Sequence, residues 1–318
     1  MIERLLVGRD ELASLAGQTI LITGADGMLA SAFCDILADV SGCRVVALNR
    51  RALDVRDRRA VLALDRVSPN VIVHCAAKVD ADYCERHPAE CRQIKVDGAR
   101  NVLDLARSTG AQVVYPQSVF VFDGVVNPAL EGTPPNPLSE YGRAKWEAEQ
   151  IIAQALPESL IVRMAGFFGG DARDKNFVGW FTRNLFKQVA QGQRTCRIGQ
   201  RVWQPTYTRD LAANILLLIA QRRSGVYHMA SYGEASFFEV ASACVEELGM
   251  ADVVAVQPLP DVERRSVEVA PRPERIIVTN ARLAAEGLDR QRHWRSALRE
   301  YLARPYFQSR VVKLLSRS

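Results

Sequence analysis

The chain has 318 residues, of which 48% are hydrophobic and 24% are charged, and its formal net charge is +5. These are ordinary values for a globular protein, and the mild positive charge suits a ligand that carries phosphate. No basic run is interleaved with aromatic residues, which argues against nucleic acid as a partner, and the apolar stretches are too short to span a membrane. The seven cysteines lack zinc-ligand spacing, so we expect reduced thiols in a cytoplasmic protein without a metal site.

Strands and helices alternate along the first half of the chain. Short apolar runs predict strands at residues 19–23, 44–48, 70–74, 112–115 and 160–164. The segments between them predict helices at residues 31–38, 56–64, 88–108 and 139–155. This alternation predicts βαβ units, and therefore an α/β fold of the Rossmann type, in which a doubly wound parallel sheet carries helices on both faces.

The pattern is less regular in the second half, where Pro, Gly and aromatic residues are denser. A strand at residues 226–228 and a helix at residues 236–248 are still predicted. We expect an N-terminal extension over residues 1–17, a nucleotide-binding domain over residues 18–165 and a smaller substrate-binding α/β lobe over residues 166–318, with segments that return to the first domain. The lobe should lie over the carboxyl edge of the sheet, where open α/β sheets bind their ligands.

The first strand ends in a turn that contains two glycines and opens the first helix. The turn reads T-G-A-D-G-M-L-A, in which Gly24 permits a tight bend and Gly27 lets the backbone approach a pyrophosphate. The helix N-terminus would offer N–H donors and a positive dipole to phosphate groups. The pattern predicts a dinucleotide site, and its alternative is an ordinary strand-to-helix turn. The contacts expected here are Gly24, Asp26, Gly27, Met28 and Leu29.

The residues that follow the second strand indicate which dinucleotide binds. NAD enzymes usually place Asp or Glu there for the ribose 2′-hydroxyl, whereas this chain has Asn49, Arg50 and Arg51. Guanidinium groups suit a 2′-phosphate, so the sequence favours NADP(H) over NAD(H). Asp54 and Val55 are placed to hold the adenine. In the alternative interpretation, the two arginines are solvated loop charges.

A Tyr and a Lys four residues apart begin the helix predicted at residues 139–155. Tyr141 and Lys145 would share one helix face, and Ser118, near the end of the fourth strand, could hold a carbonyl oxygen or the Tyr141 hydroxyl. Reduction of a ketone needs a proton donor, and a free Tyr has a pKa of about 10. We expect the Lys145 ammonium to stabilise the phenolate and to bring that pKa towards neutrality. The spacing is common by chance, but together with the glycine turn it predicts an oxidoreductase.

These motifs resemble the extended short-chain dehydrogenases/reductases, and within them the dTDP-4-dehydrorhamnose reductase family. The similarity covers nearly the whole chain after Gln18, and its more specific segments are PPNPLSEYGRAK and PTYTRDLA. The resemblance implies NADPH-dependent reduction of a 4-keto sugar linked to a nucleoside diphosphate, with Ser118, Tyr141 and Lys145 as the catalytic triad. It implies a cofactor site that also includes Cys75, Ala76, Ala77 and Lys78. It implies substrate contacts from Val119, Phe120, Asn176, Trp203, Gln204 and Arg272.

The sequence departs from the family pattern on the substrate side. The usual Asp and Tyr of S-T-D-Y-V-F-D-G are Val119 and Phe120, and the usual Asn of V-N-x-x-G is Lys95. Apolar side chains cannot hydrogen-bond a sugar hydroxyl. We therefore expect a keto sugar with fewer hydroxyls on that face, or with a methyl or acyl group there.

Other prominent residues have structural explanations that we favour. His74 should be a core residue at the end of a buried strand. A solvated loop should hold Asp80, Asp82 and Glu85, and lobe packing should account for Trp180, Phe181 and Phe186.

Two other functions stay open at this point. An epimerase or dehydratase of the same superfamily would retain its cofactor, typically NAD, against which Arg50 and Arg51 argue. A cofactor-binding regulatory subunit without turnover is the third hypothesis, against which the retained triad argues. The sequence decides neither the sugar nor the oligomeric state, for which a homodimer is one possibility.

Overall fold

The structure is a computed structural model, and it describes residues 6–260 and 268–316. Six strands form one parallel sheet in the order β10-β5-β4-β3-β1-β2. They are β1 (Thr19–Thr23), β2 (Arg44–Leu48), β3 (Val71–His74), β4 (Gln112–Ser118), β5 (Leu160–Met164) and β10 (Gly225–Met229). The order reverses at β1, because β2 lies on one side of it and β3 on the other. The predicted α/β fold of the Rossmann type is confirmed, and such a reversal is where these sheets bind ligands.

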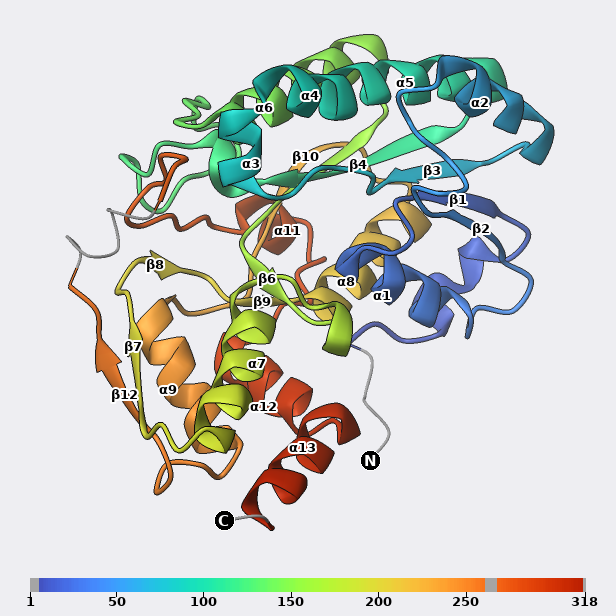
Figure 1. Ribbon diagram of the computed structural model, residues 1–318. Coiled ribbons are helices and arrows are strands. Elements are labelled where there is room, and N and C mark those ends of the chain that lie inside the picture. Colours follow the sequence, from blue (N-terminus) through green and yellow to red (C-terminus); the bar gives the residue numbers. More distant parts are fainter. Residues whose placement is uncertain (1–5, 261–267, 317–318) are drawn as a thin grey trace.

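Helices cover both faces of the sheet (Figure 1). One face carries η1 (Asp10–Leu15), α1 (Met28–Leu37) and α8 (Thr208–Ala220), and the other carries α2 (Arg58–Leu62), α5 (Gly98–Thr109) and α6 (Glu140–Ala155). Side chains alternate along a strand, so an apolar strand can feed two cores. In β1, Ile20 and Ile22 pack with α1 and α8, whereas Leu21 packs with α5 and α6.

The helix predicted at residues 88–108 is interrupted. It consists of α4 (Pro88–Arg92), a π-helical turn η3 (Gln93–Asp97) and α5. A π-helical turn bonds each residue to one five positions away and holds an extra residue. The hydrophobic pattern of the sequence did not reveal it.

The solvated acidic loop predicted around Asp82 is wrong. The segment forms α3 (Ala81–Arg86), which Asp80 caps by accepting the Tyr83 N–H at 2.9 Å. Asp82 forms an ion pair with Arg272 at 2.8 Å. Glu85 accepts the N–H of Glu140, at the start of α6, at 2.9 Å. These carboxylates therefore hold neighbouring segments in place.

Two element boundaries also differ from the prediction. Asp57 caps α2 by accepting the Ala60 N–H at 3.1 Å, so this helix begins at Arg58. The fourth strand continues to Ser118, three residues beyond the predicted end. The extension makes Ser118 the last residue of β4, at the carboxyl edge of the sheet.

The second half of the chain builds a smaller lobe below the sheet in Figure 1. Its helices are α7 (Phe177–Ala190), α9 (Phe237–Glu247), α12 (Trp294–Leu302) and α13 (Pro305–Leu315), and its strands are β7 (Thr195–Ile198), β8 (Val202–Trp203), β11 (Ala235–Ser236) and β12 (Ala255–Pro258). Their apolar side chains form a core of their own, to which Phe181 and Phe186 belong, whereas Trp180 is 50% exposed. Two further pieces lie between this core and the sheet. One is the two-stranded pair of β6 (Phe167–Phe168) and β9 (Thr206–Tyr207), and the other is the helix α11 (Ala281–Ala285). β10 and α8, which was not predicted as a helix, return to the sheet.

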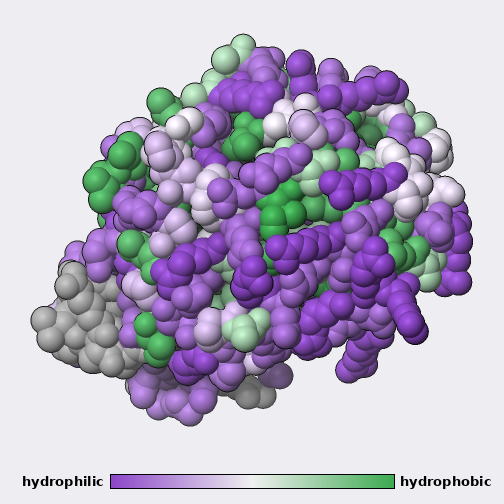
Figure 2. Space-filling view, turned by 90° about the horizontal axis from the view of Figure 1, so that it is seen from above, coloured by the Kyte–Doolittle hydropathy of each residue, from purple (hydrophilic) through white to green (hydrophobic). Residues whose placement is uncertain are grey.

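Figure 2 shows the molecule from above, on the side of α5 and α6, where hydrophilic side chains cover most of the surface. Ion pairs join neighbouring helices, for example Arg58 with Asp104 at 2.9 Å. Among the described residues, no helix has both the length and the apolar character to cross a membrane. Within the same residues, no group of three or more His, Cys, Asp or Glu side chains could hold a metal ion.

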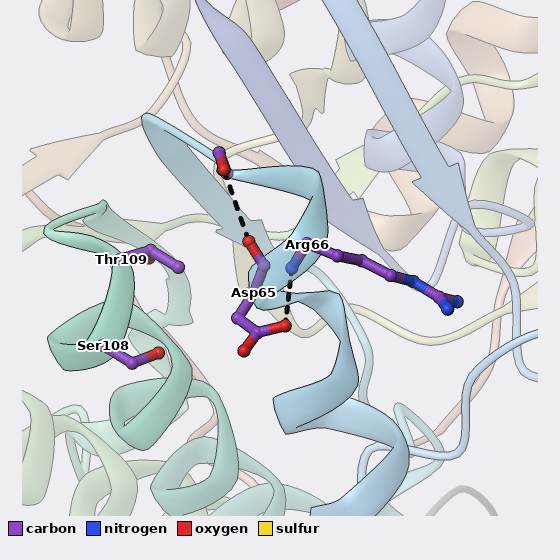
Figure 3. Close-up of a pocket in the computed structure, with 5 residues that line it drawn as sticks. Asp65, Arg66, Ser108 and Thr109 are labelled. Atoms are coloured by element: carbon purple, nitrogen blue, oxygen red, sulfur yellow. Dashed lines mark hydrogen bonds between the residues drawn. The ribbon is translucent and has the colours of Figure 1, made fainter.

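A shallow hollow lies at the amino edge of the sheet (Figure 3). It is lined by Asp65, Arg66, Ser68, Ser108 and Thr109, which come just before β3 and β4. Parallel strands place their amino ends at the edge opposite to their carboxyl ends. The hollow is therefore separate from the predicted site.

Candidate active site

The predicted site residues gather at the carboxyl edge of the sheet. Thr23, His74 and Ser118 are the last residues of β1, β3 and β4. These neighbouring strands flank the reversal in strand order. The edge thus brings the glycine turn and the predicted triad to one place.

The turn between β1 and α1 fits a phosphate site. Gly24 has a φ of +71°, and a Cβ there would lie 2.8 Å from backbone atoms of Ala76. Gly27 caps α1, and its N–H donates to the Gly24 carbonyl at 2.9 Å. No side chain caps the 10-residue α1, so its first N–H groups and the positive end of its dipole lie at the turn.

A hydrogen-bonded link joins the ends of β1 and β3. Thr23 Oγ1 lies 2.9 Å from His74 Nδ1, and it accepts the Ala76 N–H at 3.2 Å. Burial lowers the pKa of His74 to about 3, so its ring is neutral near pH 7. His74 is a core residue, as expected. The link holds the segment from Cys75 to Lys78 against the glycine turn.

The end of β2 is organised by Asn49. Its side-chain oxygen accepts the N–H groups of Arg51 and Ala52, each at 3.1 Å. Arg50 and Arg51 are exposed. Both guanidinium groups therefore project from a fixed turn at the carboxyl edge.

The two residues expected near the adenine follow this turn. Val55 is buried, whereas Asp54 forms a two-pronged ion pair with Arg56, with contacts of 2.9 and 2.5 Å. Hydrogen bonding from Arg56 lowers the pKa of Asp54 to about 2. Asp54 is therefore a carboxylate that already has a cationic partner.

The start of α6 places the Tyr and the Lys. Ser139 caps the helix by accepting the Gly142 N–H at 3.2 Å. A Cβ at Gly142 would overlap the Phe120 carbonyl, so only glycine lets α6 approach this closely. Tyr141 and Lys145 stand one turn apart, 8% and 5% exposed.

The triad converges, but its charges differ from the prediction. Burial raises the pKa of Tyr141, and a hydrogen bond with Ser118 lowers it only in part. Burial, followed by repulsion from Lys95, lowers the pKa of Lys145 to about 7. Lys145 Nζ donates to the Pro116 carbonyl at 2.6 Å. The expectation that Lys145 brings the Tyr141 pKa to neutrality is wrong, because the desolvation of the phenolate dominates. Tyr141 keeps its proton, as a proton donor must.

Lys95 is a site residue that the sequence analysis did not place. It was noted only as a departure from the usual Asn. Its side chain is 1% exposed, and its Nζ lies 4.5 Å from the centroid of the Tyr141 ring. The π-helical turn η3, which the sequence pattern did not reveal, carries it there.

The two apolar replacements on the substrate side occupy different places. Phe120 is half-buried and meets the Tyr141 ring edge-on, with 6.2 Å between centroids. Val119 is 3% exposed and packs in a cluster with Phe122 and Ile276. The structure brings Phe120 to the proton donor and places Val119 in the core behind it.

Two of the remaining residues expected to contact substrate already have partners within the protein. The Gln204 side chain accepts the Val278 N–H at 2.8 Å, and Asn176 donates to the Phe167 carbonyl at 2.7 Å. Trp203 is buried, but its indole N–H has no acceptor among the described residues. The indole nitrogen is itself buried.

Arg272 and Arg173 connect segments that are distant in sequence. Arg272 is held by Asp82 of α3, as described above. Arg173, which the sequence analysis missed, donates to Ser31 Oγ in α1 at 2.7 Å. The available signal was its place directly before residues 174–178, D-K-N-F-V, which are one of the segments that resemble the reductase family. A guanidinium from the lobe thus lies beside the N-terminal half of α1.

The family model described as RmlD substrate binding domain matches residues 18–307. A dTDP-4-keto-6-deoxy-D-glucose reductase from Streptomyces niveus is 34% identical over 284 residues, which cover 87% of this chain and 94% of that protein. The crystal structure of dTDP-4-dehydrorhamnose reductase from Bacillus anthracis in complex with NADP has a TM-score of 0.81 at 26% identity, covering 90% of this chain and 98% of that one. Methionine adenosyltransferase 2 subunit beta from Xenopus tropicalis is 28% identical, covering 91% of this chain and 88% of that protein.

Proposed function

Because this chain belongs to the RmlD substrate-binding domain family, we propose that it uses NADPH to reduce the keto group of a 4-keto sugar linked to a nucleoside diphosphate. The observation that carries the proposal is the convergence of Ser118, Tyr141 and Lys145 beside the glycine turn. This arrangement makes the protein an oxidoreductase. The reductase relatives agree with it over most of the chain.

The cofactor fits the residues at the carboxyl edge. The bare backbone at Gly24 and Gly27 and the start of α1 would hold the pyrophosphate, with Arg173 nearby. Arg50 and Arg51 would hold the 2′-phosphate. When bound, the nicotinamide supplies a hydride to the carbonyl carbon of the sugar.

The protein's own part in the reaction is to hold the carbonyl oxygen and to give it a proton. Tyr141 enters the reaction as a protonated phenol, because burial disfavours its phenolate. Ser118, hydrogen-bonded to Tyr141, is placed to bind the same oxygen. Lys145 lies one helical turn away and offers a positive charge to the phenolate that proton transfer leaves behind. One such acid–base group contributes about 10²–10⁴-fold to the rate.

On the substrate side, we propose that Phe120 contacts the sugar and that Val119 acts only by supporting it. A sugar hydroxyl against the Phe120 ring would lose water without gaining a partner, at a cost of about 1–3 kcal/mol. The preferred sugar should therefore present a deoxygenated carbon, a methyl or an acyl group there.

The other hypotheses are less well supported. An epimerase or dehydratase would retain its cofactor through the cycle, and Arg50 and Arg51 favour a dissociable NADP(H). A regulatory subunit would resemble the Xenopus relative, but such a role needs no Ser–Tyr–Lys triad. The free cysteines suit the cytoplasm, where we propose that the protein acts.

Assays with a panel of nucleotide-linked keto sugars test the reductase directly. Tyr141→Phe should reduce turnover by about 10²–10⁴-fold and leave NADPH affinity nearly unchanged. Tyr306→Phe, on α13, is the matched control and should leave turnover unaltered. Full activity of Tyr141→Phe would contradict the mechanism. No turnover on the whole panel, with NADPH bound and a protein partner co-purifying, would favour the regulatory subunit.

A further inference from the structure

Three side chains that the proposed reduction does not use form a buried polar cluster beside Tyr141. Lys95 Nζ lies 3.2 Å from Cys91 Sγ and 3.3 Å from Cys84 Sγ, and it donates to the Lys78 carbonyl at 2.5 Å. Both cysteines are fully buried. The ammonium, whose three donors are all used, also lies over the Tyr141 ring. Its charge therefore faces the proposed proton donor.

A cation this deeply buried needs an anion close to it. Cys91 can supply one: a hydrogen bond from Cys84 and the charge of Lys95 both lower the pKa of the Cys91 thiol. The same hydrogen bond raises the pKa of Cys84, which stays protonated. The cluster thus places the Lys95 amine between two sulfur atoms, of which Cys91 is the one that ionises more readily, and the Cys84 thiol also reaches the Lys78 carbonyl at 3.8 Å.

The charges of this cluster reach the catalytic residues. After burial, the charge of Lys95 is the largest cause that lowers the pKa of Lys145, and Cys91 opposes it more weakly. The negative charge of Cys91 acts on Tyr141 in the opposite sense and raises its pKa. The other titratable groups around these residues are Cys75, Glu140 and Glu149, together with Tyr115 of β4 and His74 of β3, both of which interact with Lys145.

We propose that Lys95 is a positioning residue of the reductase site, in which a buried Lys95–Cys91 ion pair stands where the family usually has Asn and sets the charge around Tyr141 and Lys145. The inference rests on the proposed function. It also gives the cluster a mechanical role, because Lys95 ties the cofactor-lining segment at Lys78 to the helix that carries the proton donor.

The test is the pH profile of kcat/KM for keto-sugar reduction by the full chain. Lys95→Met removes the cation, which acts on Lys145 more strongly than Cys91 does, so the pKa of Lys145 should rise and the basic limb of the profile should move to higher pH. Cys91→Ser removes the anion and keeps the cation, so the basic limb should move to lower pH. Each shift should be about one pH unit, which corresponds to about tenfold in activity at a fixed pH on that limb. Lys95→Gln is the second variant if Lys95→Met does not fold.

The controls are Lys187→Met on α7, which removes an exposed positive charge, and Cys244→Ser on α9, which alters an equally buried thiol. Both should keep the wild-type limb. If Lys95→Met and Cys91→Ser lose activity equally at every pH, or move the limb in the same direction, Lys95 has only a structural role and the proposal fails.

A second readout separates this proposal from the reductase assignment. Ultraviolet absorption of thiolates should show one cysteine that titrates below the ordinary range, lost in Cys91→Ser and Lys95→Met but kept in Cys244→Ser. If the wild type reduces no keto sugar but shows this thiolate, the reductase assignment fails and the ion pair stands. If no such thiolate is found, the ion pair is overturned whatever the activity.

Discussion

Substituting alanine at Gly24 should damage both the fold and the cofactor site. Gly24 has a φ of +71°, and its Cβ would lie 2.8 Å from both the Cα and the N of Ala76 and 2.9 Å from the carbonyl carbon of Cys75. Ordinary contacts of a Cβ begin at 3.4 Å. All three neighbours are backbone atoms, so no side chain can rotate away. The segment after β3 must move, and that segment is proposed to line the cofactor.

The magnitude follows from two separate costs. Placing a non-glycine residue in the left-handed region costs about 1–2 kcal/mol, and overpacking a rigid site costs about 1–3 kcal/mol more. Gly110, at the end of α5, is the matched control, because its φ is also +71° and nothing lies within 4 Å of its Cβ. Gly110→Ala should therefore lower the free energy of unfolding by about 1–2 kcal/mol, and Gly24→Ala by about 2–5 kcal/mol.

Denaturant unfolding and calorimetric titration with NADPH measure the two effects. Gly24→Ala should raise the Kd for NADPH by at least about tenfold, or about 1.4 kcal/mol, and Gly110→Ala should leave it unchanged. Equal losses of stability in the two variants, with NADPH affinity intact in both, would refute the close approach and the cofactor site together.

Three further variants test other parts of the site. Alanine at both Arg50 and Arg51 should remove the preference for NADPH over NADH in calorimetric titration; an unchanged preference would assign the 2′-phosphate to other residues. Glu149→Gln breaks the buried ion pair between Glu149, which is 2% exposed, and Arg163 of β5, whose closest contact is 2.6 Å. The loss should cost about 3–5 kcal/mol of unfolding free energy. The control Glu147→Gln, on the surface of the same helix, should cost at most about 1 kcal/mol. Similar losses in the two variants would argue against the buried pair. The pKa of His74 is lowered to about 3 in the folded chain and is about 6.5 when unfolded, so the unfolded chain binds more protons between these values and stability should fall as the pH falls through them. His74→Gln should flatten that fall, and an identical pH dependence would show that the ring does not stay neutral in the fold.

Much of the architecture could be predicted because it depends on short, regular spacings. Alternating apolar runs identify β1 to β5, and glycines after the first strand mark the turn into α1. The interval between Tyr141 and Lys145 fixes them to one helix face. Each of these signals acts within a few residues, so the sequence carries it without knowledge of tertiary contacts.

The remaining features depend on packing between distant segments. Val119 and Phe120 are adjacent apolar residues, but one is buried and one meets Tyr141, because η4 (Val119–Val121) turns them in different directions. The rise in the Tyr141 pKa comes from the burial that α6 and β4 create together. The acidic residues near Asp82 acquire their roles only through Arg272 and α6, which lie far away in sequence.

The extra residue in η3 also fixes the rotational phase between the two helical segments that it joins. Each residue of an α-helix advances the side-chain direction by about 100°. With the π-helical turn in place, Cys91 and Lys95 point towards Tyr141 while Val102 and Leu103 of α5 remain in the core below α2. Deleting one residue between Gln93 and Asp97 would restore regular α-helical bonding and turn one segment by about 100° relative to the other. Either the charged cluster or the apolar face of α5 would then leave its place, so this segment tolerates changes of residue type more readily than a change of length.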